Sequence, residues 1–172
     1  LLSVATPSHT QVTSIYAVEV KNTSGGAALQ GFVTCDIRID FDGQWSGSQL
    51  LIDLDEGSFY RDPFGNANGA KPADAIIGAF PSAGFDSFVI GTPGGGAVDL
   101  GGPAGAEFPA NGGTSLNQAW NPPAGEVNAD QTGFLTARIT LSDDATGTWS
   151  YLASAGGEIT RLEGVPIFGG AL

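Results

Sequence analysis

The alternation of hydrophobic and polar positions is most regular within residues 31–54, GFVTCDIRIDFDGQWSGSQLLIDL. The apolar positions of its first half are Val33, Cys35, Ile37, Ile39 and Phe41, and the polar positions between them are Thr34, Asp36, Arg38 and Asp40. A period of two predicts a strand with one face on a core and the other in water. The dipeptide at 42–43, Asp-Gly, predicts a turn, and the apolar run at 49–54 predicts a second strand paired with the first.

Similar short patterns recur along the rest of the chain, separated by turn residues. They cover residues 12–20, 85–90, 97–100, 115–120, 134–141, 148–153, 158–162 and 165–168. Only residues 73–79, between Pro72 and Pro81, suit a short helix. About nine or ten strands with almost no helical periodicity predict an all-β protein, a single antiparallel β-sandwich or jelly roll with long Gly/Pro-rich loops. We expect one sandwich domain over residues 12–172, preceded by an N-terminal arm over residues 1–11.

Composition agrees with one folded domain. The chain has 172 residues, of which 41% are hydrophobic, enough to form a core. Its 27 glycines and 10 prolines show no fixed period, which excludes a collagen-like or simple repeat structure.

The charge balance narrows the choice of partners. Eighteen acidic residues face six basic ones, for a formal net charge of -12. A chain this acidic is repelled by phosphate backbones and anionic lipid, so we expect no nucleic-acid binding and no membrane insertion of the mature chain. No apolar run reaches the roughly 18 residues that a membrane-spanning helix needs.

Cysteine and methionine usage bears on the compartment. The chain contains one cysteine and no methionine, and it opens with Leu1-Leu2-Ser3-Val4. This opening fits the mature product of signal-peptide cleavage, and it also fits a chain trimmed at its start. We expect a secreted chain, located outside the cell or on its surface. Cys35 lies on the apolar side of its predicted strand and is expected to be a buried, unpaired thiol.

The sequence has no arrangement typical of nucleophilic catalysis. His9 is the only histidine and lies in the arm, and no Gly-x-Ser-x-Gly elbow is present. One His and one Cys also fall short of the three or four ligands of a transition-metal site. A carboxylate pair for glycoside hydrolysis stays open because such residues need only meet in space. The candidates for it are Asp53, Asp55, Glu56 and Asp62, although the first two also fit the polar face of a strand. We expect that the protein is not an enzyme.

Calcium is the metal that these acidic residues suit best. The candidate ligands are Asp53, Asp55, Glu56, Asp62, Asp143 and Asp144. Carboxylates in loops are the hard oxygen ligands that Ca²⁺ prefers, although the spacing is not that of an EF-hand and acidic residues are common in turns for their own backbone bonding.

Two further features have competing interpretations. Asn22-Thr23-Ser24 fits the N-glycosylation acceptor pattern, and it also fits ordinary turn chemistry. The aromatic residues Trp45, Tyr60, Trp120, Trp149 and Tyr151 would stack on sugar rings if several were exposed together. Aromatic residues on sheet faces more commonly belong to the core.

Two segments resemble a known family. They are residues 45–60, with WSGSQL followed by GSFY, and residues 135–149, LTARITLSDDATGTW. They are similar to the secreted β-sandwich domains of bacterial surface proteins sorted by the exosortase system through a Pro-Glu-Pro tail, and the second is also similar in pattern to late strands of cohesin-like domains. The resemblance covers about a quarter of the chain, and no Pro-Glu-Pro tail follows Leu172. It implies an extracellular location and a structural or adhesive role.

Two functional hypotheses follow. The first is a secreted structural protein, a building block of an extracellular fibre, surface layer or matrix. It would form a homo-oligomer or filament through edge-strand contacts, with the arm over residues 1–11 adding to a neighbour's sheet. The arm would equally well cover its own sandwich. The second hypothesis is a cohesin- or lectin-like module that binds a polysaccharide or a protein, with or without Ca²⁺.

Overall fold

The structure is a computed structural model that describes residues 11–92, 98–101, 108–109, 112–124 and 128–172. Within these residues it contains eight strands and three short helical elements. The strands are β1 (Val12–Val20), β2 (Phe32–Glu56), β3 (Phe88–Val89), β4 (Asp99–Gly101), β5 (Ser115–Asn121), β6 (Asn128–Ser142), β7 (Thr146–Ala155) and β8 (Glu158–Phe168). The helical elements are η1 (Thr23–Leu29), α1 (Asp74–Ala79) and η2 (Pro81–Phe85).

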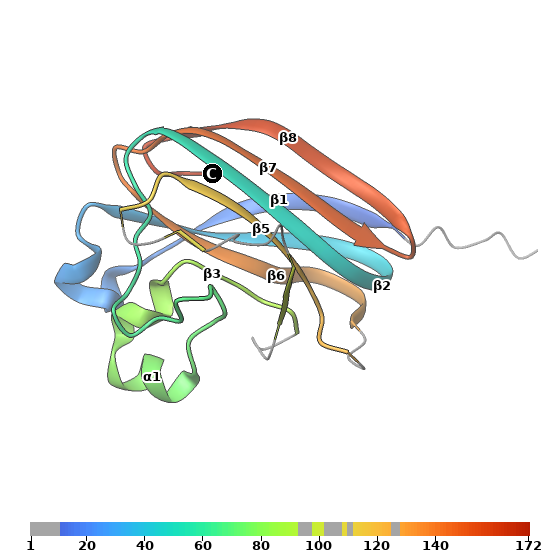
Figure 1. The fold of residues 1–172 in the computed structure, drawn as a ribbon, viewed down its shortest axis with the longest axis horizontal. Coiled ribbons are helices and arrows are strands. Elements are labelled where there is room, and N and C mark those ends of the chain that lie inside the picture. The colour runs from blue at the N-terminus through green and yellow to red at the C-terminus, as the bar shows by residue number, and fades with distance from the viewer. Residues whose placement is uncertain (1–10, 93–97, 102–107, 110–111, 125–127) are drawn as a thin grey trace, which may run out of the picture.

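Strand β2 belongs to both layers of the sandwich (Figure 1). Its first half pairs with β1 and β6, and β6 also pairs with β3; we call this the first sheet. Its second half pairs with β7 and β5, which continue to β8 and β4; we call this the second sheet. Every one of these pairings is antiparallel, which confirms the predicted all-β, antiparallel sandwich.

The turn predicted at residues 42–43 is wrong, because the chain continues through it as one strand of 25 residues. Gly43 has φ 79°, and its N–H donates to Asp130 Oδ1 at 2.6 Å. The pairing with β6 changes register on both sides of Phe41, as expected of β-bulges, which bend a strand and increase its twist. The bend turns β2 from the first sheet into the second. A further pair of expected strands merges in β8, where Gly164 has φ 62° and lies near a register shift.

The core lies between the two sheets, on the face that the alternation predicted. Its largest fully buried side chains include Trp45, Trp120 and Tyr151. Cys35 is buried and has no disulfide partner, as expected. The buried members of the predicted apolar face are Cys35, Ile37, Ile39 and Phe41.

The opposite face of the first sheet differs from the prediction. Thr34 and Asp36 were expected to face water, and both are buried. Residues 57–87, which precede β3, and η1 lie over this face, and we call them the cover. A second and smaller apolar cluster forms beneath them. That cluster is built from Leu29, Tyr60 and Phe85, with Val20 and Phe32 beside it.

Helix α1 confirms the short helix predicted at 73–79 and starts one residue later. Helix α1 ends before Pro81, because a proline cannot continue the helical hydrogen-bond pattern, and Pro81 is the first residue of η2. In the part of the chain that the structure describes, no helix is long and apolar enough to cross a membrane. Figure 1 shows α1 at the bottom of the view, outside the two sheets.

Candidate functional site

The structure places the predicted calcium ligands in three different settings. Asp53, Asp55 and Glu56 are exposed near the end of β2. Asp143 and Asp144 are exposed in the turn between β6 and β7, and Asp62 is buried in the segment that covers the first sheet. Among the described residues, no three His, Cys, Asp or Glu side chains come together in a way that could hold a metal ion.

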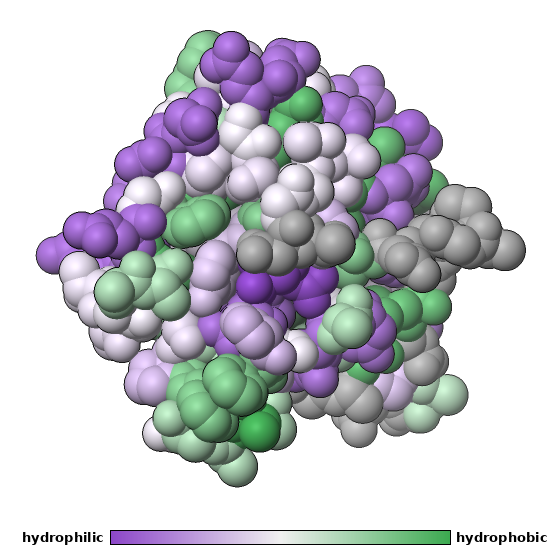
Figure 2. All heavy atoms as spheres, turned by 60° about the vertical axis from the view of Figure 1, so that its left-hand side comes forward, coloured by the Kyte–Doolittle hydropathy of each residue, from purple (hydrophilic) through white to green (hydrophobic). Residues whose placement is uncertain are grey.

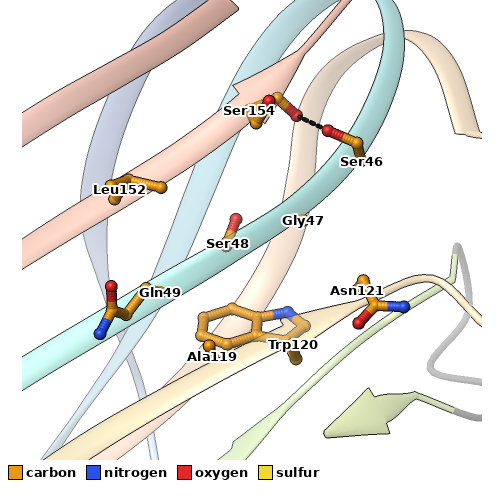
Figure 3. A pocket seen from close by; sticks show the side chains of 9 residues that line it. All are labelled: Ser46, Gly47, Ser48, Gln49, Ala119, Trp120, Asn121, Leu152 and Ser154. Atoms are coloured by element: carbon orange, nitrogen blue, oxygen red, sulfur yellow. Dashed lines mark hydrogen bonds between the residues drawn. The ribbon is translucent and has the colours of Figure 1, made fainter. Parts of the chain in front are cut away.

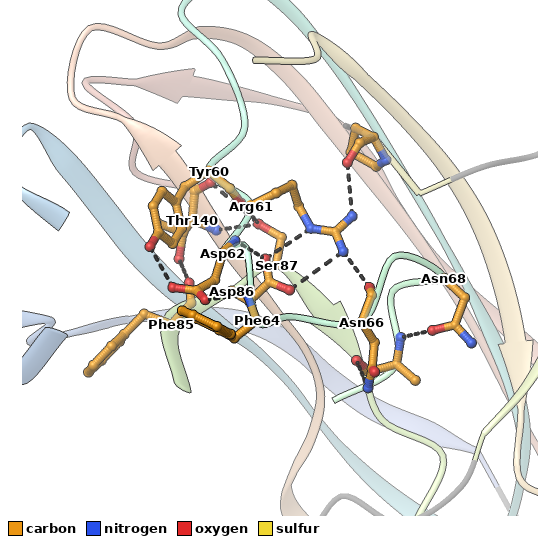
Figure 4. Close-up of polar contacts among 12 residues, drawn as sticks. Tyr60, Arg61, Asp62, Phe64, Asn66, Asn68, Phe85, Asp86, Ser87 and Thr140 are labelled. Atoms are coloured by element: carbon orange, nitrogen blue, oxygen red, sulfur yellow. Dashed lines mark hydrogen bonds and ion pairs between the residues drawn. The ribbon is translucent and has the colours of Figure 1, made fainter. Parts of the chain in front are cut away.

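The side chain of Asp62 instead takes part in a buried network (Figure 4). Its carboxylate accepts hydrogen bonds from the Tyr60 hydroxyl and from the Phe64 N–H, each at 2.8 Å. Its own N–H donates to Asp86 Oδ1 at 3.0 Å, and Arg61 Nε lies 2.9 Å from the same oxygen. Asp86 has no exposed surface, so this is a buried ion pair with its acceptor oxygens occupied. Sequence reasoning missed Arg61 and Asp86.

Arg61 joins several loops. Its guanidinium donates to the carbonyl oxygen of Pro109 at 2.9 Å and to that of Asn66. It also lies 4.8 Å from the centre of the Phe108 ring, within the range of a cation–π contact. One side chain therefore holds three loops against the ion pair with Asp86.

Burial shifts the titration of this network. Desolvation raises the pKa of Asp86, and the positive charge of Arg61 offsets part of that rise. Desolvation also raises the pKa of Tyr60, and its hydrogen bond to the Asp62 carboxylate acts in the same direction. The arrangement holds Tyr60 as a neutral hydrogen-bond donor.

A second ion pair fixes the cover to the first sheet. Asp36 accepts from Arg138 Nε at 2.7 Å and from Arg38 at 2.9 Å. Arg138 also donates to the carbonyl oxygen of Gly84 at 2.7 Å, and its guanidinium lies over the ring of Phe85 at 5.7 Å. The sheet and η2 are therefore joined by charged and polar contacts.

The scarcity of cations is the signal that could have found these pairs. The chain has six Lys and Arg residues, and Arg38, Arg61 and Arg138 all pair with buried aspartates. In a chain of net charge -12, an arginine at a polar strand position is expected to neutralise a buried carboxylate. The sequence does not tell which aspartate it meets.

The five aromatic residues considered for sugar stacking are all buried. They pack in the core or beneath the cover, which agrees with the interpretation that aromatic residues on sheet faces belong to the core. Among the described residues, the ring of Phe168 in β8 is exposed. Phe64 and Phe80 are also exposed, and their rings stack with centroids 3.7 Å apart and planes 9° from parallel. With Ile76 they form an apolar patch over α1, and Figure 2 shows apolar side chains gathered at the bottom of that face.

Asn22 is half-buried, and its side-chain amide already makes hydrogen bonds within the protein. Its amide donates to the carbonyl oxygen of Phe32 at 2.7 Å and lies 3.5 Å from the Thr34 hydroxyl. These contacts fit the turn interpretation of the Asn22-Thr23-Ser24 sequence.

Two long strands have one free edge each. Within the described residues, β1 pairs only with β2, and β8 pairs only with β7. The two strands approach each other at one end, where the Thr160 hydroxyl donates to the carbonyl oxygen of Val12 at 3.1 Å. Strand β3 is only two residues long, and its Val89 also bridges to Ala70.

No family model, no curated protein and no solved structure matches this chain. The resemblance to exosortase-sorted surface proteins therefore stays a prediction.

Proposed function

We propose that this protein is a secreted, non-catalytic building block of an extracellular fibre, surface layer or matrix, and that its copies assemble by edge-strand contacts. The observation that carries the proposal is the pair of long strands, β1 and β8, that each bond to one neighbour only among the described residues. Such edges present unpaired backbone N–H and C=O groups, which another strand satisfies by adding to the sheet.

The first part of β8 is the better acceptor. Pro166 lacks an N–H, and the shift near Gly164 interrupts the regular ladder, so residues 158–163 form the most regular stretch of the edge. Within it, the Thr160 side chain contacts β1 through Val12. Leu162 packs against the core while remaining partly exposed, and Ile159 is exposed. An added strand would cover both side chains.

The proposed donor is the N-terminal arm of a second copy. Residues 1–10 lie outside the described residues, and their sequence, LLSVATPSHT, contains no Asp, Glu, Lys or Arg. An uncharged segment approaches a chain of net charge -12 without like-charge repulsion. The carbonyl oxygen of Gln11 accepts from the Asp42 N–H at 3.0 Å, so the ladder beside β2 extends to the first described residue. A head-to-tail contact of this kind produces a filament when the rotation between copies does not close a ring.

Negative-stain electron microscopy beside light scattering tests the proposal, on the full chain and on a variant without residues 1–10. We expect regular filaments or sheets from the full chain and monomers from the shortened one. Ile159→Glu should weaken assembly, and Ile76→Glu in α1 is the matched control that should not. A full chain that stays monomeric at high concentration would contradict the proposal, and disassembly by a calcium chelator alone would move the contact to the acidic loops.

A further inference from the structure

The outer face of the second sheet carries a shallow hollow of ≈ 300 Å³ that crosses three neighbouring strands (Figure 3). It is lined by Ser46, Gly47, Ser48, Gln49, Ala119, Trp120, Asn121, Leu152 and Ser154, which come from β2, β5 and β7. Its volume is at the lower end of the range for small-ligand sites, so it suits a short piece of a ligand. None of these residues belongs to β1, β8 or the N-terminal arm, although Leu152 and Ser154 pair with Arg161 and Ile159 of β8.

The hollow exists because the strands come together closely at small residues. The register between β2 and β7 shifts between Trp45 and Gly47. A Cβ on Gly47 would lie 2.9 Å from the carbonyl oxygen of Trp120, so only glycine permits β5 to approach this closely. Ala119 also leaves open space on the surface because its side chain is short.

The floor of the hollow is rigid. The buried Ser48 hydroxyl accepts from Trp45 Nε1 at 3.1 Å and from the Tyr151 hydroxyl at 2.7 Å. Trp120 Nε1 donates to the carbonyl oxygen of Ile90 at 3.1 Å. These buried side chains lie on the core side of the sheet and fix the backbone beneath the hollow, so the surface is preformed and the entropic cost of binding is lower.

The chemistry of the lining indicates the ligand. None of its nine residues carries a charge, although the chain has a net charge of -12. Gln49 and Asn121 contribute amides, Ser46 and Ser154 contribute hydroxyls, and Leu152 provides an apolar flank. Within the lining an anionic ligand would find no cation and a cationic one no carboxylate, although the charged residue Arg161 of β8 pairs with Leu152 beside it.

The side-chain oxygens of the two amides can accept hydrogen bonds from hydroxyl groups of a ligand. Gln49 Nε2 donates to Asn117 Oδ1 at 2.9 Å, which leaves the Gln49 carbonyl oxygen as an acceptor. Asn121 Nδ2 donates to the carbonyl oxygen of Pro122 at 3.0 Å, with the same result. The Ser46 hydroxyl donates to the Ser154 carbonyl oxygen at 3.2 Å and retains its lone pairs. Acceptors next to an apolar flank match a sugar ring, which presents both O–H donors and C–H faces.

We propose that this hollow binds a short segment of a neutral polysaccharide. In the proposed extracellular setting it would attach the protein to a glycan matrix. The lining contains no residue of β1, β8 or the N-terminal arm, and glycan binding is measured without filament formation, so the failure of this proposal and the failure of the assembly proposal are separate results.

The test is affinity gel electrophoresis of the full chain in gels that contain neutral polymers of glucose, mannose, galactose or N-acetylhexosamine, beside a gel with the anionic polymer alginate. We expect retardation by at least one neutral polymer and none by alginate. The double variant Gln49→Ala/Asn121→Ala should lose at least about tenfold in affinity, the equivalent of 1.4 kcal/mol. Gln131→Ala, which removes an amide from the first sheet, is the matched control and should bind as the parent does.

Each other outcome contradicts the proposal. These outcomes are the absence of retardation by any neutral polymer, retardation by alginate to the same extent, or unchanged binding of the double variant. A thermal unfolding curve for each variant shows that a loss of binding does not come from a loss of folding. Chemical-shift changes on titration with a neutral oligosaccharide should centre on residues 46–49 and 119–121, because these line the hollow.

Discussion

The outer faces of the two sheets have similar alternating sequences and opposite environments. On the first sheet, Thr34 and Asp36 are buried beneath the cover. On the second, Gln49 and Asn117 lie at the surface and bond to each other. The comparison shows that alternation identifies the core face of a strand, while the environment of the other face depends on what the rest of the chain places over it.

The cover also determines which polar groups stabilise the protein. Beneath it, polar side chains are buried and must be paired, because a buried polar group without a partner costs free energy. On the open face, water replaces any lost contact. Substitutions of the same kind should therefore have large effects on the first sheet and small ones on the second.

The largest effect is expected from Arg61→Ala, which breaks the buried ion pair. Asp86 would be left as a buried carboxylate without its cation, at a cost of about 3–5 kcal/mol in the free energy of unfolding. Urea unfolding followed by Trp fluorescence measures this. Arg161→Ala is the control, because Arg161 lies 3.8 Å from Glu163 at an exposed site, and its loss should cost less than about 1 kcal/mol. Equal losses in the two variants would show that the cover contributes nothing.

Thr140→Val should have the next largest effect. The Thr140 hydroxyl donates to the carbonyl oxygen of Phe85 at 2.6 Å, so the Thr34 hydroxyl at 2.9 Å must donate to Thr140. Valine keeps the shape and leaves both neighbours unsatisfied beneath the cover, which costs about 1–3 kcal/mol. The matched change on the open face is Thr148→Val, which should alter the free energy of unfolding by no more than about 0.5 kcal/mol. A reversed order would contradict the comparison.

Phe64→Ala tests the surface of the cover itself. Phe64 is 50% exposed and stacks on Phe80, and such ring pairs contribute about 0.5–1.5 kcal/mol beyond the area they bury. Thermal unfolding of Phe64→Ala and Phe80→Ala should show similar losses, and the double variant should lose less than their sum. Phe168→Ala is the control, because this ring is 72% exposed. Strictly additive losses would mean that the two rings do not interact.

The contrast between the faces also separates what the sequence predicts from what it does not. Strand β1 and the inner face of β2 follow from local alternation, and α1 follows from the prolines around it. The burial of Asp36 depends on residues about fifty positions away, so no local pattern contains it. The bend at Gly43 looks like a turn because a bulge and a turn use the same residues.

The candidate site was less predictable than the fold. The acidic residues were expected to gather around a metal, and Asp62 instead belongs to a network with Tyr60 and Asp86. Asp86 lies in a stretch that was interpreted only as a strand. The hollow over Gln49 depends on three strands meeting in register, and that register is a property of the whole sheet.

The smallest predicted effect is a difference in pH dependence between the covered region and the rim of the first sheet. Hydrogen bonds from the Ser14 hydroxyl and the Gly133 N–H lower the pKa of Asp40, which is partly solvated. Its contribution to stability is present above the ordinary Asp pKa of about 3.9 and is lost as the pH falls through the lower folded value. Asp40→Asn should therefore reduce the loss of stability below that pH.

Asp86 should respond with the opposite sign, because burial raises its pKa in the folded state. The folded protein then binds more protons than the unfolded chain between about pH 3.9 and the raised folded value, so this group makes stability fall as the pH rises through that window. In Asp86→Asn the free energy of unfolding should depend less on pH above about pH 3.9. Its dependence at lower pH, which comes from Asp40, should be unchanged. Urea midpoints measured at several pH values for the parent and both variants would separate the two windows. If both variants altered stability in the same pH range, the pKa values of Asp40 and Asp86 would not be shifted in opposite directions, and the prediction would be wrong.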